Sequence, residues 1–283
     1  MNNKVILGTH MRGGKATSTA KQALSLKAEF DVMNQIAASA GLADYGILIL
    51  KQPRKMYTIG DRQQDKREWQ NAAKALGGRL NLIYDLDYIP QEPKTLAWNK
   101  LHRYAFEELQ AETFMYVDLM LPKWEKTLRN AAIKKLGELA EQSQKADYVI
   151  GDYTPVPYKD PKDPTRQEAA RMKIIIEEGV KQMLSSRFPT ILSRWPLFKD
   201  LKRPRSEFHA LSKRLYNDLK TLAPIPYDYG LQMLIVARVK DRIIRREDIG
   251  NVPETGTYSP HKMIEQLRRV DFQLAQIQDW YAK

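Results

Sequence analysis

Short apolar runs alternate with longer amphipathic segments through the first half of the chain. A short apolar run is typical of a buried strand, and apolar residues at helical spacing predict an amphipathic helix. The strands predicted in this way are residues 4–10, 43–51, 79–87, 113–121 and 146–153, and the helices between them are 20–41, 61–78, 95–109 and 124–144. Asp61 is the predicted N-cap of helix 61–78, and Gly77 is its predicted C-cap. The alternation predicts an α/β fold with a mostly parallel sheet, whose ligands bind beyond the carboxyl ends of the strands.

The second half of the chain has a different pattern. Four prolines between residues 154 and 168 predict an extended connection. Helical patterns follow at 169–188, 206–222 and 261–283, and 231–239 is a predicted strand. The change near residue 155 divides the chain into two parts of one domain, 1–154 and 155–283.

Composition and charge narrow the classes of function. The 283 residues include no cysteine, which excludes disulfides, thiol nucleophiles and cysteine metal sites and fits a reducing cytoplasm. The sequence lacks G-x-S-x-G, H-E-x-x-H and G-x-G-x-x-G motifs, which disfavours hydrolase and dinucleotide-binding functions. It also lacks a run of the roughly 20 apolar residues that span a bilayer, so we expect a soluble, cytoplasmic protein. The net charge of +12 indicates a polyanionic partner, a phosphorylated substrate or an anionic membrane surface, without choosing among them.

Residues 8–19, GTHMRGGKATST, come close to a phosphate-binding P-loop but miss its pattern. In G-x-x-x-x-G-K-[ST] the lysine and the hydroxyl are adjacent, because amides, ammonium and metal converge on one phosphate. Here Gly14 stands where the lysine is required, and Lys15 is followed by Ala16. The alternatives are a basic surface loop, a loop that contacts phosphate with another geometry, and the P-loop of a nucleotide kinase whose ATP binding depends on Lys15.

Acidic residues lie at the carboxyl ends of the predicted strands, at the edge where a ligand would bind. Asp85 and Asp87 are two residues apart, so in a regular strand they share a face and could hold Mg²⁺ or Mn²⁺ beside substrate phosphate oxygens. Asp118 follows an apolar run, where its charge is tolerated if the strand opens onto a cleft. Asp152 follows the run at 146–151. Chance occurrence of D-x-D and simple termination of the strands are the alternative interpretations.

Histidines and basic clusters give weaker signals. None of the four histidines has a partner at a metal-binding spacing such as H-x-x-x-H. We expect His102 to be structural, His209 to be solvated at the start of a basic helix, and His261 to open the last helix. Lys and Arg cluster at 199–214 and 240–246, where they would bind phosphate or remain solvated. Aromatic residues are not interleaved there, so a stacking platform for single-stranded nucleic acid is not indicated.

Four segments stand in a characteristic order. Residues 92–124 carry a lysine loop and a helix that lead into the run with Asp118, residues 146–153 read ADYVIGDY, residues 194–200 read RWPLFKD, and residues 227–235 read YDYGLQMLI. In this order and spacing they resemble the GT-A-fold nucleotide-sugar glycosyltransferases of the mannosylglycerate synthase and glucosyl-3-phosphoglycerate synthase type. The resemblance runs from about residue 44 to the C-terminus.

The resemblance implies a fold and a separate binding role for each half of the chain. The fold would be GT-A-like (Rossmann-like), with a mostly parallel central sheet flanked by helices and a helical C-terminal acceptor part. Residues 1–154 would form the nucleotide-sugar-binding α/β half, and residues 155–283 the helix-rich acceptor-binding half of the same domain.

The resemblance also implies roles for single residues. The matching positions are Asp61 near the base or ribose, Lys94 facing the diphosphate, Asp118 as the first aspartate of D-x-D, Asp200 holding sugar hydroxyls and Asp228 near the reaction centre. The glycine-rich loop with Lys15 would be a basic rim over the donor diphosphate or an anionic acceptor.

The metal site implied by the resemblance is altered in this chain. The second aspartate of D-x-D is replaced by Met120, and the C-terminal ligand falls at His261 or Glu254. Asp85 and Asp87 could supply a displaced site.

These observations predict a metal-assisted hexosyltransferase that uses Mn²⁺ or Mg²⁺. It would move a hexosyl group from a nucleotide diphosphate sugar to a hydroxyl of an anionic acceptor, and the resemblance implies a retaining outcome. The alternatives that stay open are a glycosyltransferase acting on modified bases in DNA, a catalytically degenerate nucleic-acid-binding protein on the same fold, and the P-loop kinase.

Overall fold

The computed structural model describes most of the chain. The described residues are 4–11, 19–53, 57–89, 94–118, 121, 124–158, 162–222, 229–254 and 259–281.

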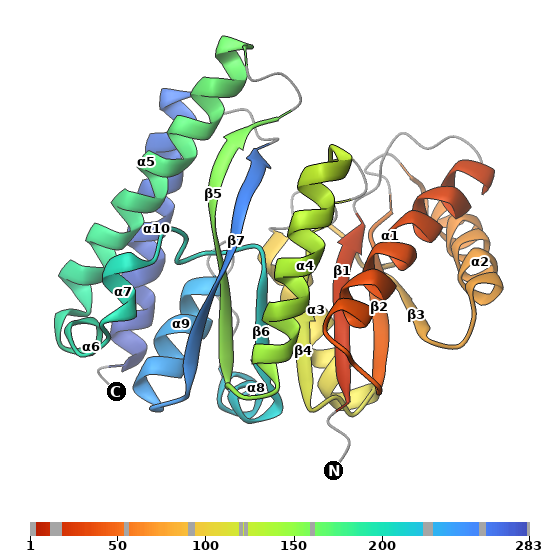
Figure 1. Cartoon of the computed structure of the whole chain (residues 1–283), viewed down its shortest axis with the longest axis horizontal. Helices are drawn as coiled ribbons and strands as arrows, with labels where there is room; N and C mark the ends of the chain where they lie inside the picture. Colours follow the sequence, from red (N-terminus) through yellow and green to blue (C-terminus); the bar gives the residue numbers. More distant parts are fainter. Residues whose placement is uncertain are drawn as a thin grey trace.

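One seven-stranded sheet runs through the described residues, in the order β3-β2-β1-β4-β6-β5-β7 (Figure 1). The strands are β1 (Val5–Met11), β2 (Tyr45–Lys51), β3 (Leu80–Tyr84), β4 (Thr113–Tyr116), β5 (Tyr148–Pro157), β6 (His209–Ser212) and β7 (Ile244–Glu254). β6 is antiparallel to both of its neighbours, and the other pairs are parallel. The predicted α/β fold with a mostly parallel sheet is therefore confirmed.

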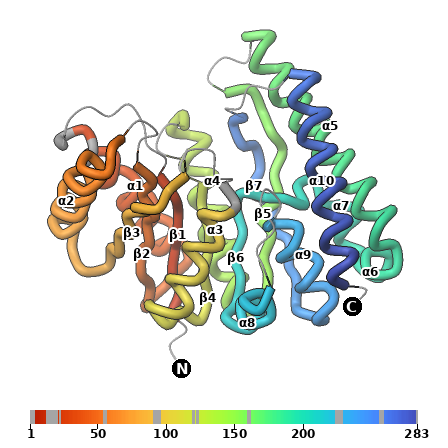
Figure 2. Tube along the Cα trace, turned by 180° about the vertical axis from the view of Figure 1, so that it is seen from behind, coloured from red at the N-terminus to blue at the C-terminus, as the bar shows by residue number. Residues whose placement is uncertain are grey.

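Helices cover both faces of the sheet and bury two hydrophobic cores. On one face α1 (Thr19–Ser39), α2 (Ile59–Leu76) and α4 (Lys126–Ser143) enclose a core with β1, β2 and β5. The opposite face, in front in Figure 2, packs against α3 (Lys94–Arg103), its π-helical continuation η1 (Tyr104–Glu108) and α9 (Tyr229–Val239). The remaining helices are α5 (Pro164–Arg187), α6 (Pro189–Ser193), α7 (Leu197–Asp200), α8 (Lys213–Leu219) and α10 (Pro260–Tyr281). None of the helices in the described part is long and apolar enough to cross a membrane.

Gly8 lies inside β1 and not in a loop. A Cβ built on Gly8 would come within 2.2 Å of the Phe114 ring, so only glycine lets this strand pass beneath that ring. The first glycine of the near-P-loop is thus a packing residue of a buried strand. The rest of that motif, including Lys15, lies outside the described residues apart from Thr9, His10, Met11 and the backbone of Thr19.

Three predictions for the second half were wrong or incomplete. Residues 209–212 form the central strand β6 instead of part of a helix, and 231–239 belong to α9 instead of a strand. Every residue from Tyr229 to Ala237 is buried, so the apolar run has no exposed face and therefore no periodicity to distinguish helix from strand. β7 was not predicted at all.

The strand ends also differ from the prediction. β3 ends at Tyr84 and β4 at Tyr116, whereas β5 continues to Pro157 through the first part of the proline-rich connection. Prolines are tolerated there because β5 has left β6 and, among the described residues, pairs on one side only, with β7. The division at residue 154 falls inside β5 and stays a prediction.

The ends of α2 correct one assignment. Thr58 is the N-cap, and Asp61 is the third helical residue of a capping box in which each side chain bonds the backbone of the other. Gly77 is the C-cap, with φ of 100°, as predicted.

Candidate active site at the carboxyl edge of the sheet

The carboxyl ends of β1 to β4 meet at one edge of the sheet. These strands are parallel, so the residues near their carboxyl ends lie along one edge: His10 in β1, Lys51 in β2, Asp85 after β3 and Asp118 after β4. This edge is where open α/β sheets bind their ligands.

An aromatic platform lies beneath the middle of this edge. The Nδ1 atom of His10 and the hydroxyl of Tyr116 are 2.6 Å apart, and both side chains are buried. Trp98 of α3 packs on Tyr116 with ring centroids 5.2 Å apart. Tyr116 thus packs against rings from β1 and α3.

Asp85 and Asp87 do not form the predicted pair on one strand face. Both follow the end of β3, in a turn where the Tyr88 amide donates to the Asp85 carbonyl. Asp85 is buried and forms an ion pair with Lys100 at 2.9 Å, whereas Asp87 is exposed. The strand geometry that would have placed both carboxylates on one ion is absent here.

Asp118 lies two residues beyond β4 and is half-buried. Val117 still donates to the Gly8 carbonyl at 2.9 Å, so the backbone next to Asp118 is held against β1. The predicted cleft at this strand end stays a prediction. Within the described ranges no group of three His, Cys, Asp or Glu side chains is placed to hold a metal ion.

His102 and His209 form a buried pair, which corrects the prediction for His209. His209 starts β6 with no exposed surface, and its Nε2 lies 3.4 Å from Nε2 of His102. Burial, together with the nearby His209, holds the pKa of His102 well below its ordinary value of 6.5. The pair is packed among Trp98, Phe114 and Tyr229, and it is a core feature, as predicted for His102 alone.

The other predicted site residues are more widely spread. His261 is exposed in the first turn of α10, and Glu254 ends β7 at 3.9 Å from Lys173. Asp200 is exposed on α7, which lies beside α5 and α10, away from β1 and β4 (Figures 1 and 2). The structure does not bring Asp200 together with Asp118.

Several predicted positions cannot be placed in the site. Asp61 is exposed, and its carboxylate bonds the Thr58 amide at 2.9 Å and hydroxyl at 2.8 Å. Asp228 and Met120 lie outside the described residues, as does the side chain of Lys94, whose backbone begins α3.

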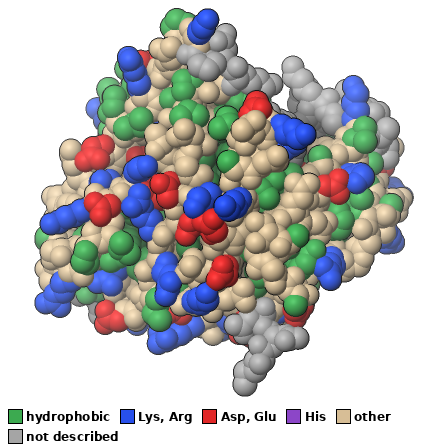
Figure 3. Space-filling model, viewed as in Figure 1, with side chains coloured by type: hydrophobic (Ala, Val, Ile, Leu, Met, Phe, Trp, Pro, Cys, Tyr) green, Lys and Arg blue, Asp and Glu red, His purple; other side chains and the backbone are tan. Residues whose placement is uncertain are grey.

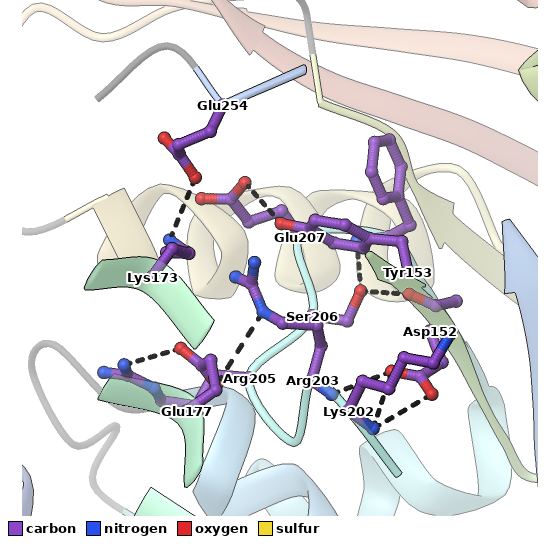
Figure 4. A network of polar contacts seen from close by, with 12 residues as sticks. Asp152, Tyr153, Lys173, Glu177, Lys202, Arg203, Arg205, Ser206, Glu207 and Glu254 are labelled. Atoms are coloured by element: carbon purple, nitrogen blue, oxygen red, sulfur yellow. Dashed lines mark hydrogen bonds and ion pairs between the residues drawn. The ribbon is translucent and has the colours of Figure 1, made fainter. Parts of the chain in front are cut away.

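A buried ionic network was not predicted from the sequence (Figure 4). It joins β5, β7 and α5 to residues 201–208, the segment that crosses to β6. Asp152, with no exposed surface, accepts bonds from the Lys202 and Arg203 amides and from Arg246 Nε at 2.7 to 3.0 Å. Glu177 of α5 pairs with Arg205 at 2.7 Å and with Arg203 at 3.8 Å.

The basic clusters are therefore partly internal. Arg203 is 1% exposed and lies over the Tyr153 ring at 4.3 Å, and Arg242 pairs with Asp218 at 2.6 Å. On the face in Figure 3, Lys and Arg are interspersed with Asp and Glu and do not form a continuous stripe. The signal in the sequence was that Asp152 and Glu177 each follow an apolar run, where a buried charge requires a partner.

The sequence matches no family model and no curated protein. Among solved structures, the chain is similar to glucosyl-3-phosphoglycerate synthase from Mycobacterium tuberculosis. A complex with Mn²⁺, UDP-glucose and phosphoglyceric acid aligns with TM-score 0.54 and 14% identity, over 98% of this chain and 80% of that one. Another structure of that synthase gives TM-score 0.53 and 13% identity over 97% and 80%, and a complex with Mn²⁺, UDP and glucosyl-3-phosphoglycerate gives 0.52 and 12% over 98% and 80%. The chain has the GT-A-like fold of these structures.

Proposed function

We propose that this protein is a nucleotide-sugar glycosyltransferase that moves a hexosyl group to a hydroxyl of an anionic acceptor. The observation that carries the proposal is the fold of the central sheet, in which β6 is the strand antiparallel to its neighbours. This fold is shared over nearly the whole chain with a synthase whose structure was solved with UDP-glucose. The polar carboxyl edge of β1 to β4 lies where such a fold receives a ligand.

The donor would bind across the edge between β1 and β4. Its diphosphate would face Asp118 and the Lys94 position at the start of α3, with the basic loop around Lys15 above it. Backbone amides at the N-terminus of α3 favour an anion. Asp61, fixed by its capping box, would border the base or ribose.

Asp118 fits a divalent ion only in one mode of binding. Mg²⁺ in nucleotide sites is held by one or two carboxylates together with substrate phosphates and water, rather than by a complete protein cage. A single half-buried carboxylate beside the expected diphosphate suits that mode, and Glu254, His261, Asp85 and Asp87 stay weaker candidates. When bound, the ion would neutralise the charge that develops on the departing diphosphate.

The acceptor would approach from the C-terminal half. Asp228 would lie near the reacting hydroxyl, and the net charge of +12 favours an anionic acceptor. Asp200 as a sugar contact requires α7 to lie closer to the edge than it does here. A retaining outcome is part of the proposal and rests on the resemblance of the sequence alone.

The decisive experiment is thermal unfolding of the whole chain with UDP, GDP and ADP sugars, with and without Mn²⁺. A ligand at 100 times its Kd stabilises the folded state by about 2.7 kcal/mol, which is easily measured. Stabilisation by one nucleotide sugar, followed by acceptor-dependent release of its nucleotide, supports the proposal. No stabilisation by any of them, combined with salt-sensitive DNA binding, would leave the fold and remove the activity.

A further inference from the structure

The network around residues 201–208 is unusual because it fixes a segment with no regular structure by buried charges. Two amides of the segment donate to Asp152, and the Lys202 ammonium reaches the Thr154 hydroxyl at 3.0 Å. Ser206 donates to the Gly151 carbonyl and accepts from the Phe208 amide. The segment is therefore fixed to β5 at both of its ends.

Glu177 supplies the second anchor. Its side chain is 2% exposed and faces Arg203, also 2% exposed, and Arg205, 17% exposed. Burial alone would raise the pKa of Glu177, but the charges of Arg205, Arg203 and Lys173 outweigh burial and hold that pKa below its ordinary value. The carboxylate is thus a charged partner that both arginines share.

This arrangement is a poor way to gain stability. The Nε and Nη1 atoms of Arg203 and Oε2 of Glu177 are buried without a hydrogen-bond partner in the described part of the protein. Replacing buried ion pairs by apolar side chains of similar volume is often neutral or stabilising. What the charges do provide is a defined position, because each carboxylate fixes two separate groups of the same segment.

The segment leads directly into the candidate site. Its next residue, His209, pairs with Tyr116 two positions before Asp118. Glu207 accepts a bond from the Tyr153 hydroxyl at 3.4 Å, on the side where Figure 4 shows Lys173 and Glu254. The segment therefore connects the β5, β7 and α5 side of the fold to the Asp118 edge.

We infer that Glu177 and Asp152 are positioning residues of the transfer site: they hold residues 201–208 in register between the acceptor half and the donor edge. This inference rests on the proposed glycosyltransferase function. Neither residue touches substrate. Each acts through the segment that it anchors.

The test compares Glu177→Gln with Glu178→Gln, its neighbour on α5, whose side chain is 57% exposed and pairs with Lys181. The substrates are UDP-glucose, with phosphoglyceric acid as the anionic probe, and the readouts are amide exchange of residues 201–208 and the kinetics of UDP release. We expect Glu177→Gln to speed exchange in this segment and to lower acceptor-dependent kcat/KM at least tenfold, because small misplacements at a reacting centre are costly. UDP-glucose affinity should stay within about twofold, because the donor edge is intact. Glu178→Gln should change nothing.

Arg205→Gln is the second variant, because Arg205 is on the rim of the network and its loss threatens folding less. Faster exchange at 201–208 with unchanged UDP release would overturn the inference, since the anchor would then be structural only. Unchanged exchange in both variants would overturn it as well. If the wild-type chain binds neither UDP-glucose nor any other nucleotide sugar, the proposed function fails. That failure is distinguishable from a failure of the inference, because it is seen in the wild-type chain before any substitution is made.

Discussion

The carboxyl edge of β1 to β4 and the junction of β5, β7 and α5 both place polar side chains below the surface, but with different charge arrangements. At the edge, the buried side chains of His10 and Tyr116 are in contact, and Asp118, two residues beyond Tyr116, is half-buried. At the junction, Asp152 and Glu177 are fully buried among arginines. An edge of this kind leaves charge accessible to a ligand, whereas the junction uses its charge internally to fix the chain.

The largest effect expected is at the edge. Asp118→Asn keeps the shape of the side chain and removes the charge that would face a diphosphate-bound ion. We predict a fall in kcat/KM of about 100-fold or more, about 2.7 kcal/mol of transition-state stabilisation. Steady-state UDP release across a Mn²⁺ titration measures it.

Asp87→Asn is the matched control, because Asp87 is exposed and follows the neighbouring β3 end. It should retain wild-type kinetics. Equal losses in both variants would favour the displaced metal site over Asp118.

The next effect concerns stability at the junction. Asp152→Ala leaves the Lys202 and Arg203 amides and Arg246 without their buried acceptor. Breaking a buried charged partner costs about 3 to 5 kcal/mol, so the free energy of unfolding in a denaturant titration should fall by that amount.

Asp248→Ala tests whether burial is the cause. Asp248 is aligned with Asp152 on the adjacent strand but is exposed. In the described part of the protein, its carboxylate accepts one hydrogen bond, from the Gly250 amide at 2.9 Å. A surface substitution of this kind usually changes stability by about 0.5 kcal/mol or less. A comparable loss in both variants would show that the two aspartates serve the strand pair alike.

The contrast between the two regions also explains what the sequence predicts and what it does not. Strands β1 to β4 were found because their apolar runs are separated by clearly amphipathic helices such as α2, and Asp118 was found because it interrupts such a run. β6 was missed because HALS is four residues long and directly precedes a real helix. Strand pairing with Tyr116 and Tyr148 decides its structure, and no local pattern encodes that pairing.

β7 was missed for an electrostatic reason. Its first half reads IRRED, which is typical of a solvated charged surface, yet Arg246 neutralises Asp152 on the neighbouring strand. The partners are 94 residues apart in the chain, so the charge compensation becomes visible only in the folded structure. Residue types predict the edge from the sequence alone, whereas the junction depends on pairing between residues far apart in the chain.

A third prediction uses the buried histidines between the two regions. His102 is held neutral in the folded state, whereas it takes up a proton below about pH 6.5 once unfolded. The unfolded state then binds more protons, so stability is present above pH 6.5 and is lost as the pH falls. The expected slope is about 1.4 kcal/mol per pH unit below that point for one such proton. Denaturant titrations from pH 7.5 to 5.0 measure this slope, and His102→Phe should flatten it. An unchanged slope in His102→Phe would show that other groups cause the loss of stability in acid.

The smallest effect separates a structural role of Asp61 from its predicted donor contact. Thr58→Ala removes the N-cap of α2 and should cost about 1 kcal/mol of stability. Asp61→Ala removes the carboxylate that accepts from the Thr58 amide and hydroxyl, and should also lower the melting temperature. Only Asp61→Ala should weaken nucleotide-sugar binding if its exposed carboxylate borders the base or ribose, because Thr58→Ala leaves that charge in place. Isothermal titration of UDP-glucose into both variants distinguishes the structural role from the donor contact. Equal affinities would show that Asp61 is a capping residue only and would confine the donor contacts to the edge around Asp118.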